Sequence, residues 1–380
     1  PAATAALRAS RRQKRAEMTL DLSELRALAR DLDVDAVALV PGPNFSRAIG
    51  GNFHTSERPT LVLVPPAGEP AAIVPNLELG SFARLGFPGA VFDWRDQDGY
   101  DGAFAALAEA MPLRRIAVEG QVMRVFVHHA LRRAFPQIEV RDAEREISAL
   151  RLAKSPAEIA ALEEAIRISE TALAEVLDGV RPGQTEKEVE RRLIAALFAH
   201  GAEGLAFGPI VAAGANVALP HAHAGDHALR PGEALLFDFG AQWGGLNADV
   251  TRTVFVGHAS DEDAAIYATV LAANEAAIAA TRPGATAHDV DDAATAVLEA
   301  SPFAEFILTK TGHGLGREVH EAPYIMRGNA QVLAPGMVFT DEPGLYLPGR
   351  LGVRIEDDVL VTETGARGLT AFPKTLTVVG

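Results

Sequence analysis

One short segment of the chain occurs twice. Arg181-Pro182-Gly183-Gln184-Thr185 returns as Arg282-Pro283-Gly284-Ala285-Thr286, at an offset of 101 positions (282 − 181). Each copy follows a long alanine-rich stretch and begins a second helix, with Glu188 or Asp289 at the third helical position of a capping box. β-rich hairpin segments come after each copy. Because this spacing is longer than that of solenoid repeats, the sequence predicts an internally duplicated α+β domain, with its halves related by pseudo-twofold symmetry.

The length of 380 residues exceeds what one ordinary core accommodates, so two domains are expected. Residues 19–148 alternate β-rich runs with helical stretches and predict an α/β domain that begins with a capping box at Asp21–Glu24. Its strands are expected at 36–40, 60–64, 71–75, 90–94, 115–119 and 137–141, and its helices at 77–85, 104–111 and 122–135. Residues 149–380 form the second domain, whose first helix begins at Ser155-Pro156 and ends near Asp178.

Residues 1–18 form a basic arm. The arm has no acid before Glu17 and lacks the apolar core of a signal peptide. Its cations are Arg8, Arg11, Arg12, Lys14 and Arg15. Two interpretations stay open: Met18 is the biological start, or the arm is an ordered helix used in dimerisation.

A β-hairpin is predicted between Gly232 and Gly257, because two runs of β-forming residues flank the turn-like Trp243-Gly244-Gly245. Asp238 lies within the apolar run of the first strand, where an unpaired carboxylate is either costly or neutralised. Folding back at the glycines brings Asp249 roughly opposite Asp238, and two facing acids raise each other's pKa unless a cation lies between them. The alternative is a hydrogen-bonded aspartate beside a solvent-facing one.

The second half of the duplicated domain supplies two further acids at matching places. Glu342 follows Asp238 by 104 positions (342 − 238), and Glu356 follows Asp249 by 107 (356 − 249), both close to the repeat offset. Four acids that converge where the halves meet need cations, and two divalent ions balance their charge. Gly312-His313-Gly314 adds an imidazole ligand on a flexible loop.

An oxygen-rich set with one nitrogen ligand favours Mn²⁺, Co²⁺ or Zn²⁺ over soft metals. Two such ions about 4 Å apart activate a water and polarise a carbonyl, which is the chemistry of amide hydrolysis. His221 and His320 lie near these acids in glycine- or proline-marked loops, so they are candidates to stabilise an oxyanion or to move protons. Arg354 lies on the same strand face as Glu356, because side chains alternate with a period of two.

Composition excludes several classes of function. A content of 48% apolar and 22% charged residues is typical of a soluble globular protein. The net charge of −15 argues against nucleic acid as a partner, and no apolar run is long enough to span a membrane. The absence of cysteine excludes disulfides and thiolate metal sites and fits a cytoplasmic location.

Five ordered motifs between about Ser155 and Gly380 resemble those of the pita-bread metallopeptidases. They are Asp238-Phe239-Gly240, Asp249-Val250-Thr251-Arg252-Thr253, Gly312-His313-Gly314 with His320, Glu342-Pro343-Gly344-Leu345-Tyr346, and Arg354-Ile355-Glu356-Asp357-Asp358. The first domain resembles the creatinase/prolidase N-terminal domain through Pro43-Asn44, Gly50 and Glu57-Arg58-Pro59. This combination implies an Xaa-Pro peptidase, with a dipeptidase (prolidase) favoured over an aminopeptidase P. Methionine aminopeptidases share the catalytic half but usually lack such a first domain.

The resemblance also implies a role for each matching residue. Asp238 would chelate one metal, Asp249 and Glu356 would bridge, and His313 and Glu342 would complete the second ion's ligands. Glu342 would also serve as the general base. The remaining catalytic and substrate-binding candidates are His221 and His320 for substrate and oxyanion and Arg354 for holding the bridging carboxylates. The enzyme is expected to be a homodimer that acts on small peptides with proline in second position.

One position departs from the family pattern. Many relatives carry an arginine four residues after the second loop histidine, where this chain has Tyr324. A dipeptidase still needs a cation for the substrate carboxylate, and the alternatives are Arg47, Arg327 and Arg350. Arg47 is the candidate of first choice, in a predicted loop at 44–50, with an exposed loop arginine as the other interpretation. Rival functions are creatinase-like hydrolysis without metal and a non-catalytic binding module.

Overall fold

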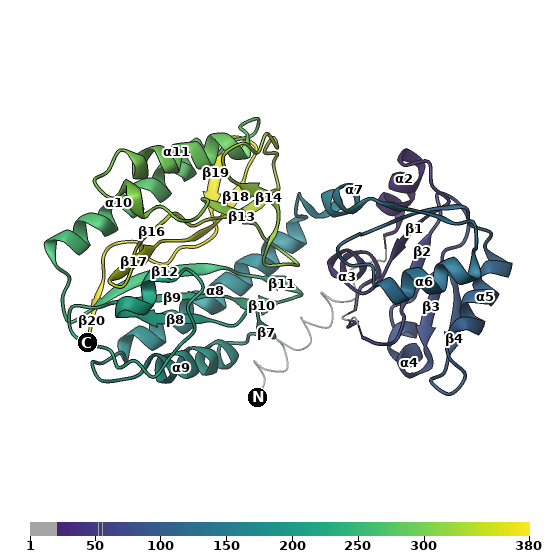
Figure 1. Cartoon of the computed structure of the whole chain (residues 1–380), viewed down its shortest axis with the longest axis horizontal. Coiled ribbons are helices and arrows are strands. Elements are labelled where there is room, and N and C mark those ends of the chain that lie inside the picture. The colour runs from purple at the N-terminus through teal and green to yellow at the C-terminus, as the bar shows by residue number, and fades with distance from the viewer. Residues whose placement is uncertain (1–20, 52, 55) are drawn as a thin grey trace. The chain divides into compact units, whose positions relative to one another are not determined.

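The computed structural model of the chain describes residues 21–51, 53–54 and 56–380 (Figure 1). The chain divides into two compact units between Arg151 and Leu152, three residues beyond the predicted boundary at 148/149. The predictions for the arm at 1–18 lie outside the described residues. No helix in the described ranges has both the length and the apolar content that crossing a bilayer requires.

The N-terminal unit is a six-stranded sheet in the order β4-β3-β2-β1-β5-β6, with helices on both faces. Along the central strand β1, Ala36 and Ala38 face one hydrophobic core, while Val37 and Leu39 face the other. The strands are β1 Ala36–Leu39, β2 Leu61–Val64, β3 Ala71–Pro75, β4 Ala90–Trp94, β5 Arg115–Val118 and β6 Glu139–Asp142. The helices are α2 Ser23–Asp31, α3 Pro43–Ile49, α4 Leu79–Ala83, α5 Asp101–Ala110, α6 Val125–Ala134 and α7 Glu144–Ser148, with short 3₁₀ turns η1 Asn76–Glu78 and η2 Ala149–Arg151. The predicted α/β layering is thus confirmed.

Three local predictions in this unit are wrong. The helix expected at 77–85 is split into η1 and α4. The capping box at Asp21–Glu24 does not form, because α2 begins at Ser23 and Asp21 Oδ1 instead accepts a hydrogen bond from the Ser23 amide at 2.9 Å. The segment 44–50, expected as a loop, is largely the helix α3, which begins at Pro43 where the fixed ring torsion suits a first helical turn.

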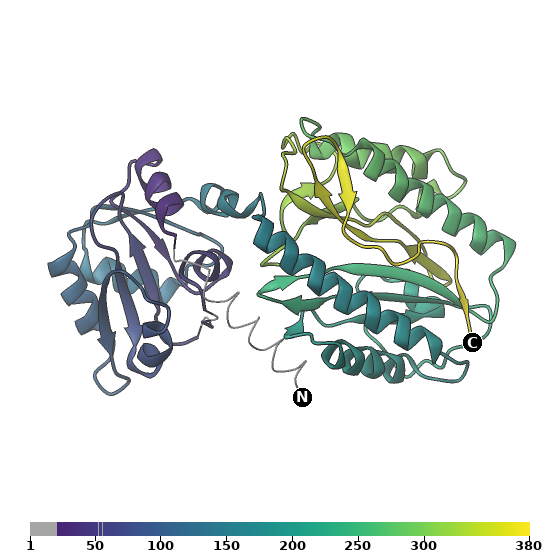
Figure 2. The same ribbon diagram turned by 180° about the vertical axis from the view of Figure 1, so that it is seen from behind.

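The C-terminal unit contains two helix pairs and the strands of both halves. In both views, strands lie between α11 at one end and α9 at the other (Figures 1 and 2). The helices are α8 Pro156–Asp178, α9 Glu186–Ala199, α10 Asp261–Ala280 and α11 Ala287–Glu299, with 3₁₀ turns η3 Gly214–Ala218 and η4 Ala304–Phe306. First-half strands are β7 Gly204–Leu205, β8 Ile210–Ala213, β9 Ala234–Phe239, β10 Ala241–Trp243, β11 Leu246–Asn247 and β12 Val250–Val256. Second-half strands are β13 Gly312–Gly314, β14 Glu321–Ile325, β15 Val338–Asp341, β16 Gly344–Leu347, β17 Leu351–Arg354, β18 Asp357–Val361, β19 Ala366–Gly368 and β20 Val378–Val379.

The duplication predicted from the repeated segment is visible in the backbone. Thr185 and Thr286 each cap a helix through a complete capping box. Each also forms an isolated β-bridge within its own half, Thr185 with Ala228 and Thr286 with Val332. The larger sheets follow the same division, with β20-β12-β9-β8 in one and β14-β13-β15-β18-β19 in the other. The helix predicted from Ser155 to Asp178 is confirmed as α8, including its capping box.

The hairpin of the first half turns where predicted, but its register differs. Gly244 and Gly245 have φ of 60° and 76°, which permits a tight two-residue turn between β10 and β11. Asp238 pairs with Thr251 on β12, whereas Asp249 was expected opposite it. The turn itself sets this register, because Trp243 pairs with Leu246 and the same ladder continues past Gly240 to pair Phe239 with Val250. Gly240, and not Asp238, is thus opposite Asp249, and a Cβ at Gly240 would lie 1.6 Å from the Ala248 carbonyl oxygen. Asp249 therefore precedes β12, two residues before Thr251.

Candidate metal centre

The two halves meet where β12 lies beside the segment joining β17 to β18. The Glu356 amide donates to the Thr251 carbonyl oxygen at 3.1 Å, and the Thr251 hydroxyl donates to Glu356 Oε2 at 2.5 Å. Thr253 Oγ1 donates to the Arg354 carbonyl oxygen at 2.9 Å. The Asp249 amide donates to Asp358 Oδ2 at 3.2 Å. These bonds fix the backbone of the acids from both halves against each other.

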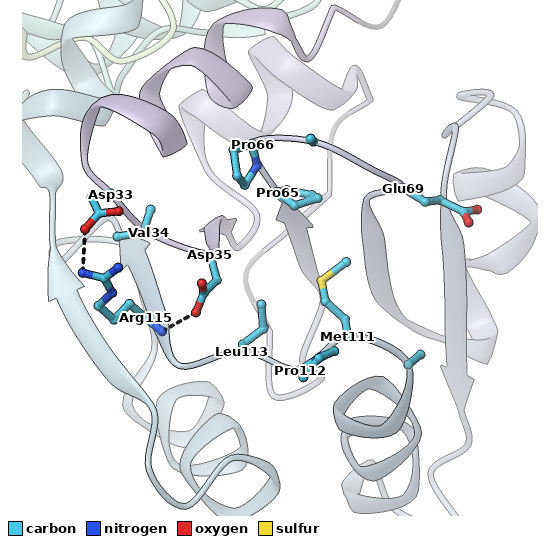
Figure 3. Close-up of a pocket in the computed structure, with 12 residues that line it drawn as sticks. Asp33, Val34, Asp35, Pro65, Pro66, Glu69, Met111, Pro112, Leu113 and Arg115 are labelled. Carbon is cyan, nitrogen blue, oxygen red and sulfur yellow. Dashed lines mark hydrogen bonds and ion pairs between the residues drawn. The ribbon is translucent and has the colours of Figure 1, made fainter.

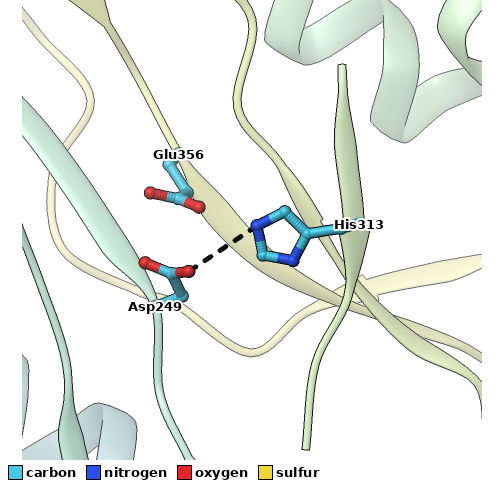
Figure 4. Close-up of side chains that lie close together, drawn as sticks. All are labelled: Asp249, His313 and Glu356. Atoms are coloured by element: carbon cyan, nitrogen blue, oxygen red, sulfur yellow. Dashed lines mark ion pairs between the residues drawn. The ribbon is translucent and has the colours of Figure 1, made fainter. Parts of the chain in front are cut away.

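Three buried side chains converge at this junction. One ligand atom from each of Asp249, His313 and Glu356 lies within 4.8 Å of the other two, and the side chains point toward one another (Figure 4). His313 Nε2 is 3.8 Å from Asp249 Oδ2 and 3.2 Å from Glu342 Oε1. Asp238 belongs to the same group, because its charge raises the pKa of both Asp249 and Glu356. The five residues predicted as metal ligands thus lie in one place.

The acids of this cluster repel one another, and burial opposes their ionisation. Burial raises the pKa of Asp249 well above its ordinary value, and the nearby Glu356 and Asp238 raise it further. Burial likewise raises the pKa of Glu356 well above its usual range, helped by Glu342 and Asp238. Within the described residues, Asp249 Oδ1 is buried without a hydrogen-bond partner. Oxygen donors of this kind, with one imidazole, fit a divalent ion of intermediate hardness, whose charge would relieve the repulsion.

Glu342 differs from its neighbours because its pKa lies below the ordinary value. Burial alone would raise the pKa, but the hydrogen bond with His313 and the charges of His313 and Arg354 outweigh it. Glu342 follows directly after β15, and Pro343 ends the strand, as predicted. Glu342 is therefore an ionised carboxylate next to Asp249 and Glu356, whose pKa values are raised.

Arg354 is buried and contacts a different pair of acids from the one expected. Its guanidinium forms an ion pair with Asp238 and lies 4.0 Å from Glu342 Oε2, whereas Asp249 and Glu356 were the predicted partners. It also donates to the Tyr346 hydroxyl at 2.8 Å and to Thr251 Oγ1 at 3.1 Å. The strand period predicted its proximity to the cluster, but the partner depends on the turn that separates Glu356 from β17.

His320 packs edge-on against His313, with their ring centroids 4.0 Å apart. Burial lowers the pKa of His320 to about 4, and the nearby His313 lowers it further, so the ring is neutral near pH 7. His221 is exposed on the segment that follows η3, and its charge also acts on His320. Arg47, by contrast, belongs to the N-terminal unit, where its guanidinium pairs with Glu24.

A separate hollow of about 470 Å³ lies on the surface of the N-terminal unit (Figure 3). Two of its acids have partners of their own, and one of them, Asp33, pairs with the Arg115 guanidinium at 2.8 Å. Asp35 Oδ2 accepts hydrogen bonds from the amides of Arg114 and Arg115. The lining residues include no histidine, so this hollow lacks the donor set of the junction.

Sequence reasoning missed Glu186, a fully buried carboxylate in the first turn of α9. It accepts hydrogen bonds from the amides of Ala213 at 2.6 Å and Gly225 at 2.7 Å. Both of its oxygens also accept from Asn216 Nδ2 at 3.1 Å. Glu186 therefore fastens both ends of the 213–225 segment, which carries His221. No sequence pattern signals this role, because its partners are backbone amides brought close only by folding.

Replacing Glu186 with alanine is expected to destabilise the protein by about 3 kcal/mol, since one buried and two half-buried donors lose this acceptor. The displaced segment should also raise KM more than it lowers kcat, because His221 is not a ligand of the cluster. Urea unfolding and steady-state kinetics would measure both effects. Glu190→Ala on the same helix is the matched control and should leave both quantities near those of the wild type. Unchanged stability in Glu186→Ala would contradict this role.

Comparisons with known proteins agree with this arrangement. Residues 160–363 match the model of metallopeptidase family M24, and residues 22–153 match the creatinase/prolidase N-terminal domain. The probable dipeptidase PepE of Mycobacterium tuberculosis is 37% identical over 93% of this chain and 94% of its own length. The Xaa-Pro dipeptidase of Pyrococcus furiosus is 38% identical over 60% of this chain and 66% of its own length.

Solved structures of similar proteins share the whole fold. A prolidase from Thermococcus sibiricus superposes with a TM-score of 0.89 at 33% identity, covering 94% of this chain and 98% of that one. An Xaa-Pro dipeptidase from Bacillus anthracis superposes with a TM-score of 0.87 at 28% identity, covering 94% and 99% of the two chains. The predicted fold, a creatinase/prolidase N-terminal domain followed by a duplicated pita-bread domain, is confirmed. The chain belongs to metallopeptidase family M24.

Proposed function

We propose that this chain hydrolyses the Xaa-Pro bond of dipeptides with two divalent metal ions. The observation that carries the proposal is the buried group of acids around His313 at the junction of the two halves. A hydrogen-bonded core does not account for this group, because its carboxylates raise one another's pKa and one oxygen of Asp249 has no partner in the described structure. The names of the relatives, several of them dipeptidases or prolidases, support the same activity.

The proposed metal ligands are Asp238, Asp249, His313, Glu342 and Glu356. Two bound ions, with Mn²⁺ as first choice and Co²⁺ or Zn²⁺ as alternatives, would supply Lewis acidity and lower the pKa of a water. Arg354 would keep Asp238 in place through a charge-assisted hydrogen bond and Glu342 through an ion pair.

Glu342 is proposed as the general base. Its lowered pKa keeps it ionised at neutral pH, so it can take the proton of the water that attacks the scissile carbonyl carbon. The same proton then passes to the proline nitrogen as the C–N bond breaks. This second transfer is needed because the Xaa-Pro bond is a tertiary amide whose nitrogen carries no hydrogen.

The two loop histidines are proposed to stabilise the substrate. His320 is neutral, so it keeps an N–H that can donate to the oxyanion that develops on the carbonyl oxygen. His221 is exposed and would contact the bound peptide. Arg47 stays a predicted contact of the substrate carboxylate, although its guanidinium already pairs with Glu24.

The alternative is an aminopeptidase P that acts on longer peptides, which Tyr324 in place of the usual arginine favours. After removal of bound metal with EDTA and addition of Mn²⁺, hydrolysis of Ala-Pro and Met-Pro is expected to exceed that of Ala-Pro-Ala at least tenfold in kcat/KM. Cleavage of the tripeptide alone would support the aminopeptidase instead. Cleavage of none of the three, with Mn²⁺, Co²⁺ or Zn²⁺, would contradict both.

We also propose that the protein is a cytoplasmic homodimer. The resemblance to the family supports a homodimer of chains, each with an N-terminal domain at 19–148 and a catalytic domain at 149–380. A chain of 380 residues without cysteine fits the reducing cytoplasm, and its net charge of −15 does not favour nucleic acid as a partner.

A further inference from the structure

A dipeptide differs from a longer peptide in carrying a free carboxylate on the residue that leaves. If the chain is a dipeptidase, as proposed above, the site needs a cation that is free to meet this carboxylate. Arg327 is already paired with Glu299 and Asp292. Arg350 is paired with Glu262 and Asp263 in the same way. The guanidinium of Arg47, the contact predicted from the sequence, is likewise paired with Glu24. None of the three arginines therefore offers an uncommitted charge.

Lys310 is the cation that the structure places beside the junction. It is exposed and lies three residues before His313, in the segment that leads into β13. Among the described residues, no carboxylate lies within ion-pair distance of its ammonium. Instead, Nζ lies 5.9 Å from the centroid of the Tyr324 ring, a cation–π distance that orients the long side chain.

Tyr324 lies on the same face of the sheet as the candidate metal ligand. It is directly opposite His313 in the antiparallel pair of β13 and β14, and opposed residues in such a pair project to the same side. Its neighbour Ile325 points the other way, into the hydrophobic core. The Tyr324 carbonyl oxygen accepts a hydrogen bond from Asn329 Nδ2 at 2.6 Å, which fixes the strand here. Tyr324 is 42% exposed and so forms an open surface opposite His313.

The Tyr324 ring connects Lys310 to the groups assigned to catalysis. Tyr324 is paired with His313, whose Nε2 lies 3.2 Å from Glu342 Oε1 and whose ring packs against that of His320. An anion held by the Lys310 ammonium would therefore be bound on the same face of the sheet as these groups.

We propose that Lys310, oriented by the ring of Tyr324, binds the free α-carboxylate of the dipeptide substrate. The ammonium supplies a compact charge in place of the arginine that the family resemblance implies at position 324, one strand away. In this proposal the Tyr324 ring orients the Lys310 ammonium, which takes the place of an arginine side chain at position 324. Lys310 would be a specificity residue that selects dipeptides and takes no part in bond cleavage.

The test compares Ala-Pro with its C-terminal amide, Ala-Pro-NH₂, which has the same shape without the charge. Lys310→Met should lower kcat/KM for Ala-Pro by about 10- to 100-fold, the range expected for loss of a hydrogen bond to a charged group. It should change kcat/KM for Ala-Pro-NH₂ by less than about twofold. Competitive inhibition by L-proline, which keeps the carboxylate, should weaken by a similar factor, while inhibition by prolinamide should not change.

Two further variants separate charge from fold. Arg167→Met removes an exposed cation of α8, paired with Glu164, and should leave both substrates unaffected. The double variant Lys310→Met/Tyr324→Arg should recover most of the preference for Ala-Pro, because it restores a cation on the same face. Equal losses on Ala-Pro and Ala-Pro-NH₂ in Lys310→Met would overturn the assignment while leaving the dipeptidase intact. A wild-type protein that cleaves neither substrate would overturn the proposed function, and this inference with it.

Discussion

Asp249→Asn is expected to lower peptidase activity at least about a thousandfold and, in the same protein, to stabilise the metal-free fold. The loss follows because Asp249 is one of the proposed metal ligands, and a metal ion contributes several kcal/mol of charge stabilisation to such a reaction, at about 1.4 kcal/mol per factor of ten. Hydrolysis of Ala-Pro with added Mn²⁺ measures this effect. Activity within tenfold of the wild type would show that Asp249 is not a ligand.

The gain in stability comes from the same carboxylate. Asp249 is buried, one of its oxygens has no partner in the described structure, and Glu356 and Asp238 act against its ionisation. A neutral amide of the same size removes this repulsion, so the free energy of unfolding in EDTA should rise by about 1–2 kcal/mol. Asp98→Asn, at an exposed position of the N-terminal unit, is the control and should alter neither activity nor stability. A destabilised metal-free Asp249→Asn protein would mean that the aspartate is held by hydrogen bonds.

Mn²⁺ is expected to stabilise the protein far more at pH 8 than at pH 5. In the metal-free protein, burial raises the pKa of Asp249 and of Glu356 above the value in the unfolded chain. The folded state therefore binds more protons, so the stability from these groups is present below the ordinary carboxyl pKa and is lost as pH rises toward the raised values. Metal binding opposes this loss because it requires deprotonated ligands.

The size of this effect follows from mass action. At a free concentration of a thousand times Kd, a ligand adds about 4 kcal/mol to the free energy of unfolding. Thermal unfolding at pH 5 and pH 8, with Mn²⁺ or with EDTA, should show a difference in Tm that widens with pH. The same measurement on Asp249→Asn should show a much smaller difference at either pH. A difference in Tm that is independent of pH in the wild type would contradict the assignment of these acids as ligands.

Much of the catalytic unit could be predicted from sequence because its signals are local or repeated. The capping boxes at Thr185 and Thr286 need only a few neighbouring residues, and both form as expected. The two glycines after Trp243 specify a turn by backbone conformation alone, and the hairpin turns there. The four acids were predicted to lie together because their spacing is close to the repeat offset. Equivalent positions of a duplicated domain meet where its two halves join.

What could not be predicted depends on contacts across the fold. The pairing of Asp238 with Thr251 is an exception, because it follows from the turn at Gly244-Gly245 and could have been counted from the sequence. Glu186 binds backbone amides of a distant segment, which have no sequence signature. The role proposed for Lys310 depends on Tyr324, which belongs to the neighbouring strand β14. At the N-terminus of α2, the Asp21 carboxylate accepts a hydrogen bond from the Ser23 amide, and the predicted capping box does not form.

The buried carboxylate at the start of α9 bears on how the two halves diverged. The position equivalent to Glu186, one residue after the capping threonine, is Ala287 in the second half, and it is equally buried. The two halves thus share the backbone of the repeat, while only the first has a carboxylate here, which holds the 213–225 segment. A chimera built from two second halves would keep the helices and strands yet leave that loop untethered, so the copies are no longer interchangeable.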